Sequence, residues 1–165
     1  MTMKIIRSLI SCTKGTAAAE MAMITPLLII IMFGAFEAGN FFWNQQVVGK
    51  AVRDGARYAG RRPLTDFAGC VPSTSVINDT RSVTRTGRIS GGTARIANWT
   101  DATTVTVTGA CSASTTGGIY RNNAGGAPVV TVSATVPYDS LFGALGFTTA
   151  TLNMRADAQA AVMGF

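Results

Sequence analysis

The feature that most constrains this chain is an uncharged, strongly apolar run near its N-terminus, from Met21 to Phe36. Counted from Ala17, the segment holds roughly 20 residues, which as a helix would span about 30 Å, the thickness of a bilayer's hydrocarbon core. A single carboxylate, Glu20, lies inside it. Because a charge in such surroundings is costly, Glu20 is a candidate functional residue. We expect one transmembrane helix here.

A cleaved secretory signal is the main alternative for this segment. The apolar part of such a signal usually holds about 7–15 residues, and a small-x-small cleavage site follows it. In this chain the run is longer, and its small residues, Ala17-Ala18-Ala19, precede the run instead of following it. We therefore expect the helix to be retained.

The charged residues bear on orientation and on the class of protein. The net charge is +6, and the residues before the apolar run include Lys4, Arg7 and Lys14. More basic residues follow the helix, between Lys50 and Arg62, so the count of Lys and Arg alone favours a cytoplasmic C-terminal part. The cysteines favour the opposite orientation, with a cytoplasmic N-terminus, and we follow them.

Cysteines occur on both sides of the apolar run, Cys12 before it and Cys70 and Cys111 after it. If the C-terminal part lies outside the cytoplasm, Cys70 and Cys111 are the natural disulfide pair, and Cys12 stays on the reducing side. Such a link would close a loop of roughly 40 residues and contribute about 3–4 kcal/mol. Three unrelated thiols are the alternative.

The helix is expected to continue beyond the membrane as far as residue 62. No proline occurs from Asn44 to Gly60, and Pro63 then disfavours helix at the residue before it. Small residues recur in both halves of this helix, at a spacing that lets another backbone approach closely. In the second half, the partner is either the chain's own sheet or a helix of another subunit. The residues expected to pack are Gly34, Ala35, Ala38, Gly39, Ala51, Gly55 and Ala59.

The C-terminal part reads as a small head with three strands. Val and Thr alternate over residues 103–108, and the ranges 129–136 and 147–162 show the same period of two. We expect these strands to form a small antiparallel sheet, with the helix at 44–60 covering one face. The predicted fold is α+β, with a long N-terminal helix packed on this sheet.

Shorter elements are expected around the sheet. Ser73 or Thr74 would cap a short helix, which Gly91-Gly92 would end. Residues 94–99 read as a short strand, and Asp139 would cap a turn at 141–145. Gly117-Gly118 and Gly125-Gly126 would bound a hairpin loop. The inner face of the short helix would hold Val76, Ile77, Thr80 and Val83.

The residues offer little for catalysis. The sequence has no histidine, and its eight carboxylates are dispersed. Histidine is the commonest general base and the commonest zinc ligand. No dinucleotide-binding, phosphate-loop or nucleophile-elbow motif occurs. We expect no enzyme, no catalytic residues, no metal site and no cofactor. We also expect no nucleic-acid partner, because the arginines are scattered and no basic run alternates with aromatic residues.

Three segments of the N-terminal half carry a recognisable pattern: Gly15-Thr-Ala-Ala-Ala-Glu20-Met-Ala, Thr25-Pro26-Leu-Leu-Ile-Ile-Ile-Met-Phe33-Gly34-Ala-Phe-Glu37-Ala-Gly39 and Ala51-Val-Arg53-Asp-Gly55-Ala56-Arg57-Tyr58-Ala59. Together they resemble the TadE-like pseudopilin family, the minor pilins of the tight-adherence (Flp, type IVc) pilus. The segment from Gly15 to Glu20 has the pattern of a type IV prepilin processing site. The likeness is strong over residues 15–60, weaker over 103–160, and missing from 61–102.

The resemblance implies a processing pathway. A prepilin peptidase would cut between Gly15 and Thr16, and Glu20 would be a recognition element for processing or assembly. The leader would be 1–15, the helix 16–62 and the extracytoplasmic head 63–165. The chain would lie in the bacterial inner membrane with a cytoplasmic N-terminus. Its partners would be the peptidase, other pilin and minor pilin subunits and the tight-adherence assembly machinery, and it would serve pilus assembly and adherence.

Two other functions stay open from the sequence. The first is an uncleaved, single-pass component of a secretion or pilus assembly machine. The second is a protein that binds nucleic acid or another anionic surface through the residues between Lys50 and Arg62. Retention of the full-length mass would favour the first, and strong salt dependence of binding would be needed for the second.

Overall fold

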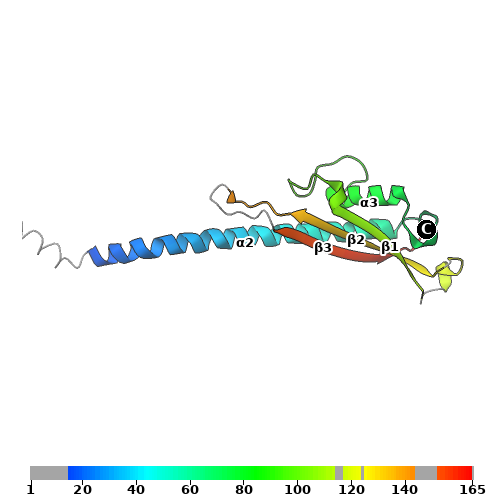
Figure 1. Ribbon diagram of the computed structural model, residues 1–165, viewed down its shortest axis with the longest axis horizontal. Helices are drawn as coiled ribbons and strands as arrows, with labels where there is room; N and C mark the ends of the chain where they lie inside the picture. The colour runs from blue at the N-terminus through cyan, green and yellow to red at the C-terminus, as the bar shows by residue number, and fades with distance from the viewer. Residues whose placement is uncertain (1–14, 114–116, 124, 144–151, 165) are drawn as a thin grey trace, which may run out of the picture. The chain divides into compact units, whose positions relative to one another are not determined.

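The computed structural model describes residues 15–113, 117–123, 125–143 and 152–164. The chain divides into two compact units, Met1–Gly39 and Asn40–Phe165. One long helix, α2 (Thr16–Gly60), contributes its first part to the first unit and its second part to the second (Figure 1). The leader, apart from Gly15, lies outside the described residues.

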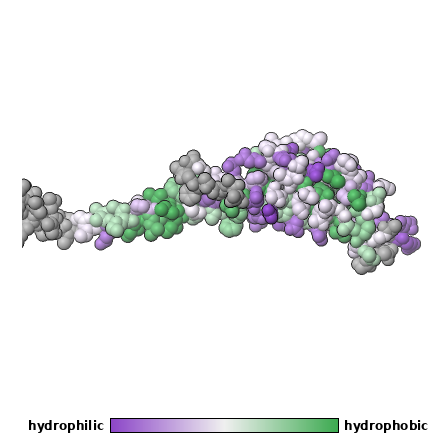
Figure 2. Space-filling view, in the orientation of Figure 1, coloured by the Kyte–Doolittle hydropathy of each residue, from purple (hydrophilic) through white to green (hydrophobic). Residues whose placement is uncertain are grey.

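In the first unit, α2 exposes its apolar side chains along its length. Met23, Leu27 and Ile30 are among those exposed, and the hydrophobic colour on this part of α2 is visible in Figure 2. The helix includes Pro26, and the preceding Thr25 hydroxyl donates a hydrogen bond to the Met21 carbonyl at 2.6 Å. This unit contains a segment long and apolar enough to cross a membrane, which fits the predicted single-pass anchor.

The second unit is a head built on a three-stranded antiparallel sheet in the order β1-β2-β3. The strands are β1 (Val105–Ser112), β2 (Ala127–Pro137) and β3 (Asn153–Ala161). Val107 lies opposite Val132, which in turn lies opposite Ala158. Buried and more exposed residues alternate over most of β2 and β3 and over the start of β1, so one sheet face is largely apolar and the other carries Thr, Ser and charged residues.

The core lies between the apolar sheet face and the second part of α2. Val48, Val52 and Ala56 of α2 are buried in the same cluster as Val132 and Val136 of β2. Residues at positions i, i+4 and i+8 share one face of a helix, which explains why this run covers the sheet. The predicted α+β fold, with a long N-terminal helix on a small antiparallel sheet, is confirmed.

A second helix, α3 (Thr74–Thr86), packs beside β1 and α2. Ser73 is its N-cap, and the Ser73 hydroxyl accepts a hydrogen bond from the Val76 amide at 3.4 Å. The helix ends at Gly87, whose φ of 79° is a left-handed conformation that favours glycine. The end therefore comes before Gly91-Gly92, where the sequence placed it.

The expected strand at residues 94–99 is wrong, because this segment forms bends and a turn. Its backbone is held by one long-range bond, from the Arg95 amide to the Arg85 carbonyl at 2.9 Å. The segment is fixed instead by Trp99, which is buried and donates from Nε1 to Thr104 Oγ1 at 2.8 Å. Together with the ion pair from Arg95 to Asp54, this buried side chain holds the segment without a paired strand.

The remaining elements are short. Within the described residues, four 3-10 turns connect the main ones: η2 (Leu64–Asp66), η3 (Ala68–Cys70), η4 (Ala102–Thr104) and η5 (Gly118–Tyr120). The third strand was expected from residue 147, but residues 147–151 lie outside the described residues. The expected turn at 141–145 lies partly outside them too.

Candidate functional site

The expected processing residues lie where α2 begins. Gly15 immediately precedes the helix, Thr16 is its first residue, and both are exposed. None of the residues that the structure describes lies within 4 Å of the position that a Cβ on Gly15 would occupy. Glu20 is also exposed and lies four residues after Thr16, which places both on one side of the helix. The described residues of the first unit therefore leave Gly15, Thr16 and Glu20 exposed.

The small residues of the first unit also have open space around them. A Cβ added to Gly34 or Gly39 would meet no described residue within 4 Å, and Ala38 is exposed between them. Ala35 is exposed as well. Within the described residues of this unit, the helix packs against no other element. Its small residues therefore present a surface that a bilayer or another helix can cover.

The small residues of the second unit pack inside the chain's own head. Ala51, Gly55 and Ala59 are all buried. A Cβ added to Gly55 would overlap Thr84 Oγ1 and lie 3.6 Å from Thr80 Cγ2, both on α3. Of the two partners left open by the sequence for this half of the helix, the structure therefore places the head against it.

Gly60, the last residue of α2, packs closely against β3. An added Cβ there would lie 2.9 Å from the Ala161 carbonyl oxygen and 3.1 Å from the Ala160 Cβ, both on β3. The Met163 amide also donates to the Gly60 carbonyl at 2.9 Å. The helix thus ends where the C-terminal strand crosses it, two residues before the expected boundary at residue 62.

Polar side chains fix the second part of α2 to the head at several points. Asn40 donates from Nδ2 to the Tyr138 hydroxyl at 2.9 Å, and the Phe41 ring meets the Tyr138 ring edge-on with centroids 5.1 Å apart. Gln45 donates from Nε2 to the Arg155 carbonyl at 2.7 Å. The bonded residues lie 98 and 110 positions apart in sequence, so no local sequence pattern predicts these contacts.

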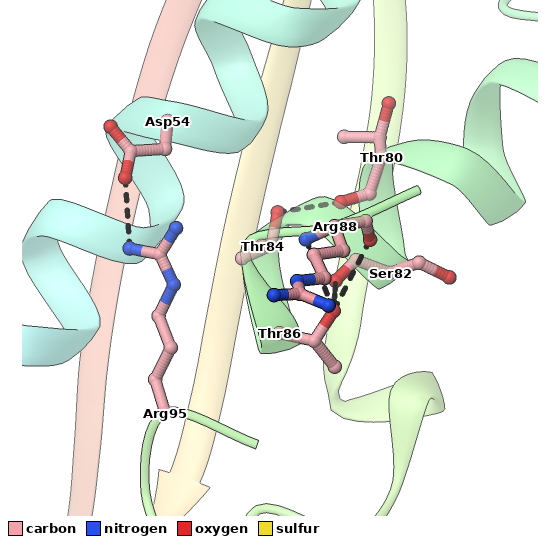
Figure 3. Close-up of polar contacts among 7 residues, drawn as sticks. All are labelled: Asp54, Thr80, Ser82, Thr84, Thr86, Arg88 and Arg95. Carbon is pink, nitrogen blue, oxygen red and sulfur yellow. Dashed lines mark hydrogen bonds and ion pairs between the residues drawn. The ribbon is translucent and has the colours of Figure 1, made fainter. Parts of the chain in front are cut away.

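Two charged or ionisable contacts tie α2 to the segments around α3. Asp54 and Arg95 form an ion pair of 2.8 Å, drawn in Figure 3. The Tyr58 hydroxyl donates to Asp79 of α3 at 3.2 Å. Partial burial, followed by the negative charge of Asp79, raises the pKa of Tyr58 above its usual value.

Thr86 holds the end of α3 together, as Figure 3 shows. Its hydroxyl bonds the Ser82 carbonyl at 2.8 Å and accepts from the Arg88 amide at 3.2 Å. Earlier in the same helix, the Thr84 hydroxyl donates to the Thr80 carbonyl at 2.8 Å. Because this bond satisfies the Thr84 hydroxyl inside α3, Thr84 can be buried against Gly55.

A disulfide joins Cys70 and Cys111, with their Cα atoms 5.3 Å apart. It fastens the 3-10 turn η3 to the end of β1. Cys70 has a φ of 65°, a left-handed conformation unusual for a residue with a side chain. Gly109 on β1 makes room for this turn, because an added Cβ would overlap the Cys70 carbonyl oxygen and lie 2.8 Å from Pro72 Cδ. Cys12 lies outside the described residues.

The solvent side of α2 in the second unit is basic, and so is Arg61, which follows the helix. Lys50, Arg53, Arg57 and Arg61 are all exposed. Among the described residues, the ion pairs are Arg62–Asp66 at 3.0 Å and Asp54–Arg95. None of the four exposed cations takes part in either pair. The described residues also contain no group of three or more side chains able to hold a metal ion.

Comparison with known proteins bears on the same helix. Residues 15–57 match the family model described as TadE-like protein. The N-terminal helix is TadE-like. The match begins at Gly15 and ends three residues before α2 does, so it covers none of the sheet. No curated protein and no solved structure matches the chain significantly.

The match confirms the family resemblance drawn from residues 15–60. The match suggests, for the N-terminal helix, an association with components of the tight-adherence pilus. The long apolar helix of this chain fits a single-pass membrane anchor.

Proposed function

We propose that this TadE-like chain is a structural minor pilin, or pseudopilin, of a tight-adherence type IV pilus. In this proposal a prepilin peptidase cuts between Gly15 and Thr16, and the trimmed chain is needed for pilus assembly and surface adherence. The observation that carries the proposal is that the family match and the exposed apolar part of α2 fall on the same residues.

The exposed apolar side chains of the first unit support a role in assembly. Leu28, Ile31 and Phe36 are each more than half exposed, at 56%, 59% and 59%. Such a surface needs either lipid or other helices around it. Packing with the helices of other pilin subunits would cover it, and the open space at Gly34 and Gly39 allows close approach.

Glu20 has a specific part in the proposed assembly. After cleavage, Thr16 would carry a free α-amino group. The carboxylate of Glu20 in one subunit would pair with this amine of a neighbouring subunit, which removes the cost of an isolated charge in the bilayer. The alternative for Glu20 is that its carboxylate reaches back to the cytoplasmic headgroups.

The proposed location is the bacterial inner membrane, with the N-terminus cytoplasmic and the head outside the cytoplasm. The Cys70–Cys111 disulfide supports this orientation, because disulfides persist in oxidising compartments and are rare in the cytosol. From the membrane the chain would pass into the surface pilus. The proposed partners are the prepilin peptidase, other pilin and minor pilin subunits, and the tight-adherence assembly machinery.

The second candidate function is an uncleaved, single-pass component of the assembly machine. One observation favours this second candidate. The small residues Ala51, Gly55 and Ala59 are buried in the chain's own head and cannot contact another subunit. Less of α2 is therefore free for packing between subunits than the sequence alone would allow.

One experiment separates the two candidates. The chain is recovered from membranes of cells with and without prepilin peptidase, and its intact mass and N-terminal sequence are determined. A chain that begins at Thr16 only when the peptidase is present supports the pilin. A chain that keeps Met1 in both strains overturns processing and favours the permanent anchor. A Gly15→Leu variant that remains full length in the presence of the peptidase is the matched control.

A further inference from the structure

The strand β3 forms an edge of the sheet, and no other strand among the described residues lies on its outward side (Figure 1). In an antiparallel pair, alternate residues bond to the neighbouring strand, and the residues between them direct their amides and carbonyls away from it. The Val162 amide donates to the Pro128 carbonyl at 2.9 Å. The Tyr138 amide donates to the Leu152 carbonyl, also at 2.9 Å. The even-numbered residues of β3 therefore bond to β2, and the odd-numbered residues face outward.

The outward-facing residues of β3 include Arg155, Asp157 and Gln159, and all three are exposed. The Arg155 carbonyl accepts a hydrogen bond from Gln45 Nε2 at 2.7 Å, which agrees with its outward direction. Within the part of the chain that the structure describes, the outward amides and carbonyls of Asp157 and Gln159 bond to no other group. An open edge of this kind is a template on which an extended segment adds as a further strand.

A row of cations borders this edge. Arg53 and Arg57 of α2, and Arg61 just after it, are exposed, and no ion pair among the described residues includes them. Arg57 and Arg61 line a shallow groove of about 250 Å³ together with Ala160 and Ala161 of β3. The cation row therefore lies beside the C-terminal end of β3.

We propose that the β3 edge binds an extended, acidic segment of another protein as an added strand. The segment would exchange backbone hydrogen bonds with Asp157 and Gln159. Every second side chain of the segment would face the side of the sheet that α2 covers, where its carboxylate meets the cation row. Every second residue of a strand is about 6.6 Å further along. Arg53 and Arg57 are separated along the helix by about 6 Å, so acidic residues at alternate positions match this spacing.

Charge and chemistry exclude two other occupants. A second copy cannot supply the segment, because no two of the eight carboxylates in this sequence lie closer than 12 positions apart. Pairing of two β3 edges would also bring two cation rows together. A nucleic acid would neutralise the cations, but it carries no peptide amides or carbonyls with which to extend a sheet. The inference concerns the second unit alone and depends neither on cleavage nor on the position of the membrane.

The experiment uses the purified full-length chain in detergent micelles. The probe is a synthetic peptide that alternates Glu with Thr over about seven residues, an ordinary strand length. At low salt it should bind about ten-fold more tightly than the same peptide with Gln in place of Glu. Amide hydrogen exchange followed by nuclear magnetic resonance should slow at Asp157 and Gln159 when the Glu peptide binds. Exchange at Ala158, whose amide already bonds to β2, should stay unchanged.

Variants test the edge and the cation row separately. Gln159→Pro removes an outward N–H and no bond to β2, and proline is tolerated on the open side of an edge strand. It should weaken binding of the Glu peptide by about five- to ten-fold, whereas Gln159→Ala keeps the N–H and should bind normally. Arg57→Gln should weaken binding by about three-fold. Arg88→Gln removes the same charge just after α3, beside the other edge strand β1, and should have no effect.

Several results would overturn the inference. One is unchanged exchange at Asp157 and Gln159 in the wild-type chain, a measurement that needs no variant to fold. Another is equal loss in Arg57→Gln and Arg88→Gln, which would indicate a general effect of charge. A third is binding of oligothymidylate as tight as that of the Glu peptide and unaffected by Gln159→Pro, which would indicate a surface for any polyanion. Slow exchange at the same amides without peptide, in a chain that dimerises, would indicate a second copy. Circular dichroism checks that each variant is folded.

Discussion

Gly55 of α2 lies directly against Thr84 of α3, so that the Thr84 hydroxyl occupies the space a side chain at position 55 would need. The Cβ of Thr84 would also lie only 3.3 Å from a Cβ at that position. Thr84 cannot easily move away, because its hydroxyl is bonded to the Thr80 carbonyl at 2.8 Å. The close crossing of the two helices therefore depends on glycine at position 55.

Replacing Gly55 with alanine should destabilise the head. The added methyl group overlaps Thr84, and overpacking of this kind costs about 1–3 kcal/mol. Urea unfolding of the full chain in detergent micelles, followed by near-ultraviolet circular dichroism, would give the change in free energy of unfolding.

Gly49→Ala is the matched control for this prediction. Gly49 lies in the same helix, and of the described residues an added Cβ would meet only the flexible end of Arg53, at 3.6 Å. Alanine is a better helix former than glycine, so this variant should be more stable by about 0.5–1 kcal/mol. If both variants gained stability, the close packing of Gly55 against α3 would be refuted.

The disulfide should contribute strongly to the stability of the head. Cys70 and Cys111 are 41 residues apart in sequence, and a bond that closes such a loop stabilises a protein by about 2–4 kcal/mol. Cys70→Ser and Cys111→Ser should each lower the free energy of unfolding by a similar amount.

The double variant should be no less stable than either single one, because both changes remove the same bond. Cys12→Ser should have no effect on the stability of the head, and unfolding with and without a reductant gives the comparison. Two clearly additive losses would mean that the cysteines stabilise the head separately.

The Tyr58–Asp79 bond should make the stability of the head depend on alkaline pH. The pKa of Tyr58 is raised in the folded chain, first by burial and then by Asp79. Between the unfolded pKa and the folded one, the folded chain holds a proton that the unfolded chain has lost. The contribution is therefore complete below about pH 10, the ordinary tyrosine pKa, and is lost as the pH rises through the folded value.

Tyr58→Phe should remove this dependence, because phenylalanine has no proton to lose. The difference in unfolding free energy between wild type and variant, measured from pH 8.5 to 11 (the range that brackets an ordinary tyrosine pKa), should shrink as the pH rises. A constant difference across that range would show that the Tyr58 hydroxyl titrates as it does in the unfolded chain.

The parts of the fold that depend on one repeating pattern were predictable from the sequence. The alternation over residues 129–136 places Val130, Val132, Ala134 and Val136 on one face, and all four are buried. The helical spacing of residues 44–60 likewise predicted which element would cover them. In both cases the burial preference of each side chain and the local periodicity agree, so no tertiary information was needed.

The parts that depend on long-range contacts were not predictable. The expected inner face of α3 included Val83, but the structure buries Thr84 instead, because its hydroxyl is satisfied inside the helix. The bond from Asn40 to Tyr138 joins residues 98 positions apart, and no local spacing encodes it. The packing partner of the small residues in the second half of α2 could not be predicted either. It depends on where the head lies against the helix, which local spacing does not specify.

Glu20 should be required for assembly if the proposed function is right. Its carboxylate would attract the free amine of Thr16 in a neighbouring subunit, and an unpaired charge in the bilayer costs about 2.5–3.5 kcal/mol. Glu20→Ala should therefore reduce incorporation into sheared pili by about ten-fold or more. Immunoblots of sheared pili and of membranes would measure both pools of the chain.

Two further variants make this prediction specific. Glu20→Asp keeps the charge and should restore part of the incorporation, whereas Glu37→Gln alters the carboxylate at the other end of the apolar run and should leave the Glu20–Thr16 pairing intact. N-terminal sequencing of the membrane pool shows whether Glu20→Ala is still cut before Thr16. A Glu20→Ala chain that is cut normally and enters pili at the wild-type level would exclude the pairing with Thr16 and favour a carboxylate that simply reaches the headgroups.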